Sequence, residues 1–146
     1  MLDIFQTDPT NPHINKTSGY LDLSILYGDV QEEQDLIRTH QDGKLKPDSF
    51  SEPRLQAFPA ACCVMLVMLN RFHNYVVEQL AEVNENGRFT KPSPTLNEEQ
   101  AKKAWAKYDE DLFQTGRLYV HLLSQIKSFS NLPQNHMWSV YQYYLI

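Results

Sequence analysis

Residues 60–69, AACCVMLVML, constrain this chain most, because they are ten consecutive residues without a polar side chain. From residue 69 onward the pattern becomes amphipathic, which at about 100° per residue is typical of a helix with one apolar face. Pro59 suits the first turn of such a helix, and Asn86-Gly87 suits its end. We therefore predict one long helix over residues 58–84. Its predicted apolar face consists of Leu69, Phe72, Val76, Leu80 and Val83, and its polar face of Arg71, Asn74, Glu78, Glu82 and Glu85.

Length and charge limit what a chain built around this helix can be. With 146 residues there is room for one domain at most. A net charge of −5 without a basic stripe argues against a nucleic-acid partner. The apolar run is shorter than the roughly 20 residues that span a bilayer, so we predict no transmembrane segment. The start, MLDIFQTD, lacks the basic residues and the long apolar core of a signal peptide.

The two cysteines, Cys62 and Cys63, are adjacent on the predicted helix. Neighbouring helical side chains point about 100° apart, so an ordinary disulfide between them is not expected. We interpret both as reduced core residues, with a redox or metal role as the alternative. Reduced thiols favour an intracellular, cytoplasmic location, and association with lipid stays open.

The segments before the long helix are shorter. Residues 17–28 alternate in a way that suits an extended segment. A short helix follows over residues 30–40, with Asp29 as its predicted N-cap and Glu32 as the capping-box partner. Its expected apolar contacts are Val30, Leu36 and Ile37. Asp42-Gly43 indicates a short hairpin in the turn-rich connection after it.

A second long helix is predicted to begin near Thr95, with Glu98 in the capping-box position. Gly116 interrupts it at a cost of about 1 kcal/mol relative to alanine. Trp105, Tyr108 and Phe113 form an aromatic stripe that we interpret as core packing and not as a cofactor site. The predicted buried face is Ala101, Trp105, Tyr108, Leu112, Tyr119 and Ile126, and the predicted solvated residues are Lys102, Lys103, Lys107, Asp109 and Glu110.

The best local candidate for chemistry lies in residues 17–24, TSGYLDLS. Ser18, Tyr20, Asp22 and Ser24 are spaced by two, so in an extended loop two hydroxyls, one main-chain carbonyl and one carboxylate face one point. Hard oxygen ligands of this kind suit Ca²⁺ better than zinc. Asp3 is the obvious second carboxylate, although segments of this composition are more often solvated turns. No histidine lies in a metal-binding pair, and His73 is interpreted as a structural core histidine, with a cofactor contact as the alternative.

Five stretches in order resemble one family: DIFQTD at 3–8, TSGYLDLSILYG at 17–28, DGKLKPDSF at 42–50, NRFHNYVVEQLAEVN at 70–84 and YDEDLFQTGRL at 108–118. They resemble the fungal fatty-acid oxygenases, namely the linoleate diol synthases and the oxygenases that make psi-factor oxylipins. These enzymes belong to the animal-type heme peroxidase and cyclooxygenase superfamily. The resemblance implies a mainly α fold, with a partial heme peroxidase (cyclooxygenase-like) domain over residues 1–118 and a divergent tail over 119–146. Within that domain it implies two long helices and an extended metal-binding loop.

The resemblance also implies cofactors and a substrate. Family members bind heme b through a proximal histidine and oxidise a tyrosine to a radical, which abstracts hydrogen from a polyunsaturated fatty acid before oxygen adds. Full-length members are expected to be oligomers. The family's Ca²⁺ ligands correspond here to Asp3, Ser18, Tyr20, Asp22 and Ser24.

Two departures from the family pattern limit the function expected of this chain. The family's distal histidine would directly precede Asp3, where this chain has Leu2, and no Tyr-x-x-His segment occurs. Leucine transfers no proton, so we assign no catalytic residue. We therefore expect a fragment of a heme-dependent fatty-acid dioxygenase that neither retains heme nor turns over alone. The alternative is a small helical calcium-binding or protein-interaction module without heme.

Overall fold

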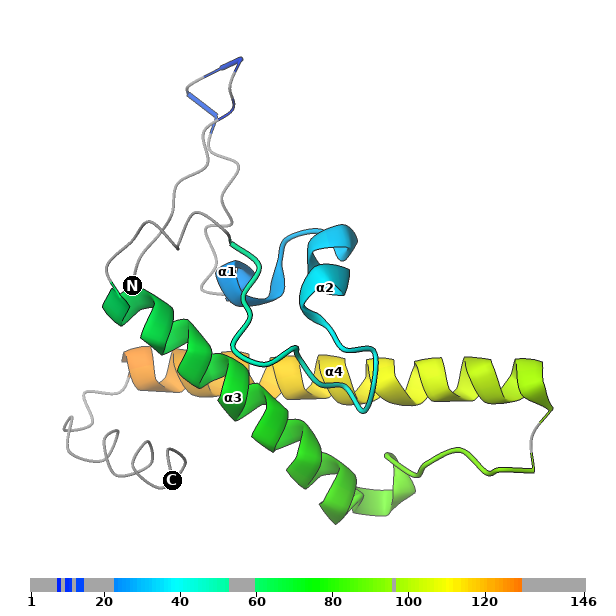
Figure 1. Ribbon diagram of the computed structural model, residues 1–146. Helices are drawn as coiled ribbons and strands as arrows, with labels where there is room; N and C mark the ends of the chain where they lie inside the picture. The colour runs from blue at the N-terminus through cyan, green and yellow to red at the C-terminus, as the bar shows by residue number, and fades with distance from the viewer. Residues whose placement is uncertain are drawn as a thin grey trace.

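The computed structural model describes residues 8, 10, 11, 13, 14, 23–52, 60–95 and 97–129. Within them the chain is mainly helical, as predicted, and an isolated antiparallel bridge between Arg38 and Leu45 is the only β pairing. Figure 1 shows the two long helices crossing, with the short helices on one side of the crossing. The elements in order are α1 (Ser24–Tyr27), α2 (Gln31–Ile37), α3 (Ala60–Val83), the 3-10 turn η2 (Glu85–Gly87) and α4 (Glu98–Phe129).

The predicted central helix is confirmed as α3, but its buried face differs from the predicted one. Leu66, Asn70, His73 and Val77 are buried, at the three- and four-residue spacing of one helix face. Val83, predicted as apolar core, is 71% exposed. The buried face therefore includes two polar side chains, His73, which was predicted as core, and Asn70, which was not.

The end of α3 lies slightly before the predicted Asn86-Gly87. Asn84 adopts a left-handed conformation with φ of 42°, which suits asparagine and terminates the helix. Its backbone N–H still donates to the carbonyl of Leu80, and its side-chain oxygen accepts from the N–H of Phe89. These bonds fix the direction in which the chain leaves toward α4.

The second long helix is confirmed as α4, with two corrections. It begins at Glu98, and the carbonyl of Asn97 accepts the first helical bond, from the N–H of Ala101. Thr95 is not the N-cap, because its hydroxyl pairs with that of Ser93 in the preceding turn. The buried positions of the helix are Tyr108, Asp109, Leu112, Phe113, Gly116 and Val120, whereas Trp105 and Tyr119 are about half exposed and were wrongly predicted as core.

Residues 23–28 are not extended, because Ser24–Tyr27 forms the single helical turn α1. Leu23 precedes it with a left-handed φ of 59°, and the N–H of Gly28 donates to the carbonyl of Ser24. This turn buries Leu26 and Tyr27 completely against α3 and α4. Residues 17–22 of the predicted extended segment lie outside the described residues.

The short helix α2 begins one residue later than predicted and has a different cap. Its N-cap is Val30, without a side-chain cap hydrogen bond, so the predicted N-cap Asp29 is wrong. The backbone N–H of Asp29 donates to the carboxylate of Glu33, and not to that of Glu32. Ile37 is buried as predicted, but Leu36 is 72% exposed and Val30 is half exposed.

The predicted Asp42-Gly43 turn is confirmed. Both residues have positive φ, 54° and 68°, and the N–H of Lys44 donates to the carbonyl of Gln41. Two positive φ angles in this order are typical of a type I′ turn, which pairs short antiparallel segments such as Arg38 with Leu45. A side chain at position 43 would meet the Leu112 Cβ at 2.7 Å, so glycine also permits the turn to touch α4.

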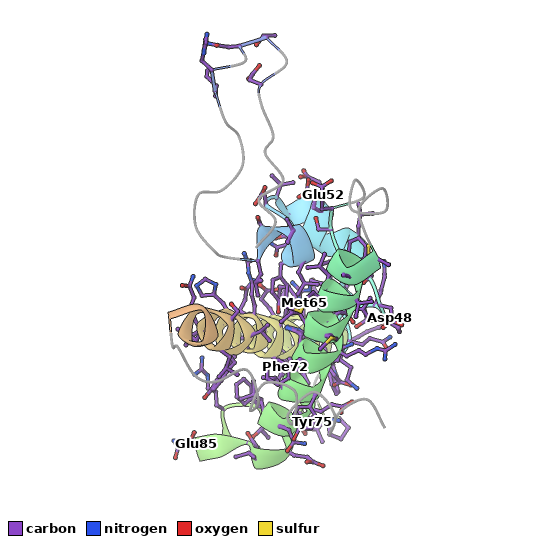
Figure 2. All side chains as sticks on the ribbon, turned by 90° about the vertical axis from the view of Figure 1, so that its left-hand side faces the viewer. Asp48, Glu52, Met65, Phe72, Tyr75 and Glu85 are labelled. Carbon is purple, nitrogen blue, oxygen red and sulfur yellow. The ribbon has the colours of Figure 1, made fainter. Side chains whose placement is uncertain are left out.

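The core lies where α1, α2 and the turn meet the crossing of α3 and α4. Figure 2 views this arrangement from one end of α4, with Met65 and Phe72 labelled on α3. No helix within the described ranges is long and apolar enough to cross a membrane.

Candidate functional site

The best-defined polar cluster surrounds His73, which is fully buried on α3. Its Nε2 lies 3.0 Å from the carbonyl oxygen of Gly43, and its Nδ1 lies 2.9 Å from the hydroxyl of Tyr27. Because a carbonyl only accepts, Nε2 carries the proton, and the Tyr27 hydroxyl donates to Nδ1. Both ring nitrogens are thereby occupied, and the neutral state with this single tautomer follows from burial, which lowers the pKa of His73.

Burial lowers the pKa of His73 from 6.5 to about 4, and the Arg38 charge acts in the same direction against the bond to Gly43. Burial likewise raises the pKa of the Tyr27 phenol far above its ordinary value. Both groups are therefore uncharged at neutral pH. This agrees with the prediction that His73 is a structural core histidine.

Gly116 makes this arrangement possible. A Cβ there would lie 2.5 Å from the Val77 Cγ1 and 3.1 Å from the His73 Cε1. The glycine, which sequence alone marks as a weak point of the helix, lets α4 approach α3 at the imidazole.

A second cluster joins the turn to α4 through a buried charge pair. The Arg38 guanidinium donates to Asp109 at 2.7 Å and to Glu110 at 2.6 Å. It lies 4.0 Å above the ring of Phe113. The other carboxylate oxygen of Asp109 accepts the N–H of Gly43 at 2.6 Å. Asp109 was predicted to be solvated, and this is wrong, because its side chain is one of the most buried charges described.

This cluster lowers the pKa of Glu110, whose side chain is about half exposed. Burial by itself raises the pKa of the Glu110 carboxyl, but hydrogen bonds from Gln114 and Arg38 bring the pKa below its ordinary value. Beside this cluster lies an open cleft of about 630 Å³. It is lined in part by His40, Trp105 and Glu110, but the charge of Arg38, its most buried cation, is already paired with two carboxylates.

Most of the predicted calcium ligands lie outside the part of the chain that the structure describes. Asp3, Ser18, Tyr20 and Asp22 lie outside the described residues, and only Ser24 is placed, as the first residue of α1. Across the described residues no group of three or more His, Cys, Asp or Glu side chains comes together as a metal site. The calcium set therefore stays a prediction.

The described residues do not fit a heme ligand at the core histidine either. An iron ligand needs a free imidazole nitrogen lone pair, and both nitrogens of His73 are engaged within the protein. Cys63 forms no disulfide, and its exposure is intermediate, whereas a core position was predicted. The side chain of Cys62 lies outside the described residues.

Sequence reasoning missed the Arg38–Asp109 pair and the buried role of Asn70. One signal was available: Asp109 lies four residues before the buried Phe113 and seven before Gly116, on the same helical face. The partner Arg38 is 71 residues away, and no local pattern identifies it.

Comparison with known proteins gives consistent matches. The chain is 84% identical over 116 residues to the linoleate 10R-lipoxygenase of Aspergillus fumigatus, an alignment covering 80% of this chain and 10% of that protein. It is 53% identical over 146 aligned positions to the psi-producing oxygenase A of Aspergillus fumigatus, an alignment covering 94% of this chain and 13% of that protein. It is 51% identical over 137 positions to the 7,8-linoleate diol synthase of Pyricularia oryzae, where the alignment covers 89% of this chain and 11% of that protein. No family model and no solved structure matches.

These relatives define a class of fungal oxygenases, two of them named for linoleate. This chain is homologous to one segment of these fungal oxygenases. The chain spans about a tenth of the length of the curated relatives it matches. The family predicted from the five motifs is thereby confirmed.

Proposed function

We propose that this chain supplies a helical scaffold segment of a heme-dependent fatty-acid oxygenase of oxylipin synthesis. The observation that carries this proposal is the 84% identity to a linoleate 10R-lipoxygenase over 116 residues. Under the proposal, the segment is part of a heme peroxidase (cyclooxygenase-like) domain, and a polyunsaturated fatty acid is the substrate of the whole enzyme.

The proposed role is positioning and not catalysis. The two best-defined polar side chains are engaged in internal bonds: His73 holds the turn at Gly43, and Asp109 holds both the turn and Arg38. Both ring nitrogens of His73 have partners, so neither is available to ligate iron. Its pKa of about 4 keeps the imidazole neutral at neutral pH, so it does not readily relay protons. In this proposal the heme ligands belong to other parts of such an enzyme, and we derive no step through the heme.

The proposal also includes one calcium ion held before α1. Its ligands would be the carboxylates of Asp3 and Asp22, the hydroxyls of Ser18 and Ser24, and the carbonyl of Tyr20. Five oxygen donors with two negative charges suit Ca²⁺. The ion would tie the N-terminal segment to the start of α1, which packs on the His73 cluster.

A segment exchange tests whether the chain is an oxygenase segment. A 116-residue alignment within a chain of 146 always contains residues 31–116, so these residues can replace their counterparts in the Aspergillus fumigatus linoleate 10R-lipoxygenase. We expect the exchanged enzyme to fold and to oxygenate linoleate at a rate within about tenfold of its parent. An exchanged enzyme that folds but is inactive would favour the alternative, a small module without heme.

The matched control exchanges the same residues with Asp109→Asn, which disrupts the scaffold without touching any predicted cofactor ligand. We expect this variant to lose soluble enzyme, since it leaves Arg38 buried and poorly paired. The isolated chain forms the second control: mixed with hemin and linoleate, it should consume no more oxygen than free hemin. Turnover by the isolated chain that exceeds free hemin would contradict the positioning role.

A further inference from the structure

The second half of α4 is apolar on more of its circumference than α3 and α1 cover. At about 100° per residue, the buried positions 109, 113, 116 and 120 share one face of roughly 60° around their mean direction. Leu118, Tyr119, Leu122 and Leu123 extend from this face around to the opposite side, and all four are exposed, Leu118 by 54% and Leu122 by 47%. Between Leu118 and Ile126 the sequence has no charged side chain.

The first turns of α3 add to this surface. Val64 and Met65, directly before the buried Leu66, are exposed by 55% and 48%. Leu66 of α3 and Val120 of α4 belong to the same core cluster, so these apolar residues flank it. Figure 1 shows the start of α3 and the C-terminal part of α4 at the same end of the helix pair, and Figure 2 labels Met65 there. We call this surface the apolar end; it consists of Val64, Met65, Leu118, Tyr119, Leu122 and Leu123.

The other end of α4 has the opposite character. Lys102, Lys103 and Lys107 are exposed there, as are Glu98 and Glu99. Along residues 117–125 of α4, one strip of the circumference is polar, and apolar residues occupy the rest. The polar strip consists of Arg117, His121, Ser124 and Gln125. Single exposed apolar residues need no explanation, but six on two neighbouring helices mark an interaction surface.

The comparisons indicate what covers the apolar end. In the psi-producing oxygenase A, 94% of this chain is aligned, so at most about nine residues lie outside the alignment and α4 falls within it. That relative has a chain nearly eight times longer than the aligned part, since the alignment covers 13% of it. Within one polypeptide of that size, an uncharged apolar surface on two core-forming helices is expected to be interior.

We propose that the apolar end is the face on which the remainder of an oxygenase polypeptide packs, through an uncharged apolar surface of its own. This inference rests on the proposed function and specifies which face is the contact. Leu118 and Leu122, one turn apart on the outer side of α4, form its centre, and Val64 and Met65 extend it onto α3. Val83, at the far end of α3 and 71% exposed, lies outside it.

The test places lysine at the apolar end in two settings. In the first, residues 60–129 replace the aligned stretch of the Aspergillus fumigatus psi-producing oxygenase A, and soluble yield and oxygenase activity are measured. Met65→Lys and Leu122→Lys should each lower both by at least about tenfold, because a lysine buried without a partner is strongly unfavourable. Val83→Lys is the matched control, an equally drastic change at an exposed apolar residue, and should behave like the parent.

In the second setting the same three variants are made in the isolated full chain. None should lower its unfolding midpoint, since these side chains are largely in solvent, and Leu122→Lys should reduce binding of a hydrophobic dye. Met65→Lys and Leu122→Lys variants as active as the parent exchange would overturn the inference. A dimer of the isolated chain that dissociates in the Leu122→Lys variant would also overturn it, because the face would then bind a second copy. Flotation of the chain with phosphatidylcholine vesicles, if lost in the Leu122→Lys variant, would overturn it too, because the face would then bind lipid.

The two exchanges also separate this inference from the proposed function. If the 31–116 exchange is active and the lysine variants of the 60–129 exchange have no effect, only the docking face is overturned. Inactivity of the folded 31–116 exchange overturns the proposed function, and the docking face with it. An inactive, insoluble 60–129 parent beside an active 31–116 exchange contradicts the docking face, since the transplanted α4 then fails to fit the rest of the enzyme.

Discussion

The Arg38 guanidinium lies 2.7 Å from the carboxylate of Asp109, and both side chains are almost completely buried. The pair joins the end of α2 to the middle of α4, and the second Asp109 oxygen holds the N–H of Gly43 at the turn. The Asp109 carboxylate therefore joins α4 both to the turn at Gly43 and to the charged side chain of Arg38. A buried pair of this kind adds little stability compared with an apolar substitute, but removing one partner strands the other.

Asp109→Asn should accordingly destabilise the chain by about 3–5 kcal/mol, because the amide cannot satisfy both Arg38 and the N–H of Gly43. The measurement is the free energy of unfolding from urea denaturation followed by circular dichroism. Asp48→Asn is the matched control, since Asp48, labelled in Figure 2, makes a similar contact with Arg71 in which both side chains are about half exposed. It should change stability little, because exposed pairs contribute little. Equal effects of the two variants would mean that burial does not determine the role of Asp109.

The stability of the chain should fall as pH drops from about 6.5 to about 4. His73 in the folded chain has a pKa of about 4, below the 6.5 of an unfolded histidine, so in this window the unfolded chain binds more protons. The contribution is fully present above pH 6.5, is lost as pH falls toward 4, and amounts to roughly 3 kcal/mol at most. The measurement is the unfolding free energy as a function of pH.

His73→Gln supplies the control for this pH dependence. Glutamine keeps a donor that reaches the Gly43 carbonyl but does not titrate, so the variant should be less stable at neutral pH and should show a shallower slope below pH 6.5. A wild-type slope identical to that of the variant would show that His73 is not the titrating group.

Gly116→Ala should destabilise the chain, although alanine favours helices by about 1 kcal/mol. The added methyl would lie 2.5 Å from the Val77 Cγ1, and overpacking of this kind costs about 1–3 kcal/mol. We expect a net loss of about 1 kcal/mol. In a double-mutant cycle with Val77→Ala, which removes the clashing methyl, the two changes should together cost less than the sum of each alone. Strict additivity would indicate that α4 does not approach α3 at this glycine.

Calcium should stabilise the isolated chain at millimolar concentration if the predicted loop binds it. A ligand at about 100 times its dissociation constant adds about 2.7 kcal/mol, enough for a clear rise in the melting temperature. Asp22→Asn should abolish this rise, because it removes one of the two predicted carboxylate ligands, while Asp29→Asn, outside the predicted set, should leave it intact. Melting temperatures that are unchanged by calcium in the parent chain would remove this site.

The local features of this fold were predictable from the sequence. Residues 60–83 form a helix because the apolar run and the amphipathic period after it favour no other regular structure. Asp42-Gly43 forms the turn because both positions need a positive φ that these residues adopt readily. The family was predictable too, since five motifs in order depend on residue identity and not on packing.

Tertiary structure alone decided which faces are buried. His73, Asn70 and Asp109 are interior because α3 and α4 cross at Gly116, and a crossing buries a short patch of each helix and not a continuous stripe. Val83 and Trp105 lie away from this crossing and are exposed despite their hydropathy, and Tyr119 is exposed because it lies on another side of α4 than the buried Val120. Polar groups enter such a patch only if partners satisfy them, and those partners, Gly43 and Arg38, come from a segment 30 to 71 residues away. Helical periodicity reports only on neighbours within a few turns, so the sequence determined the helices and the turn, and the crossing determined the core.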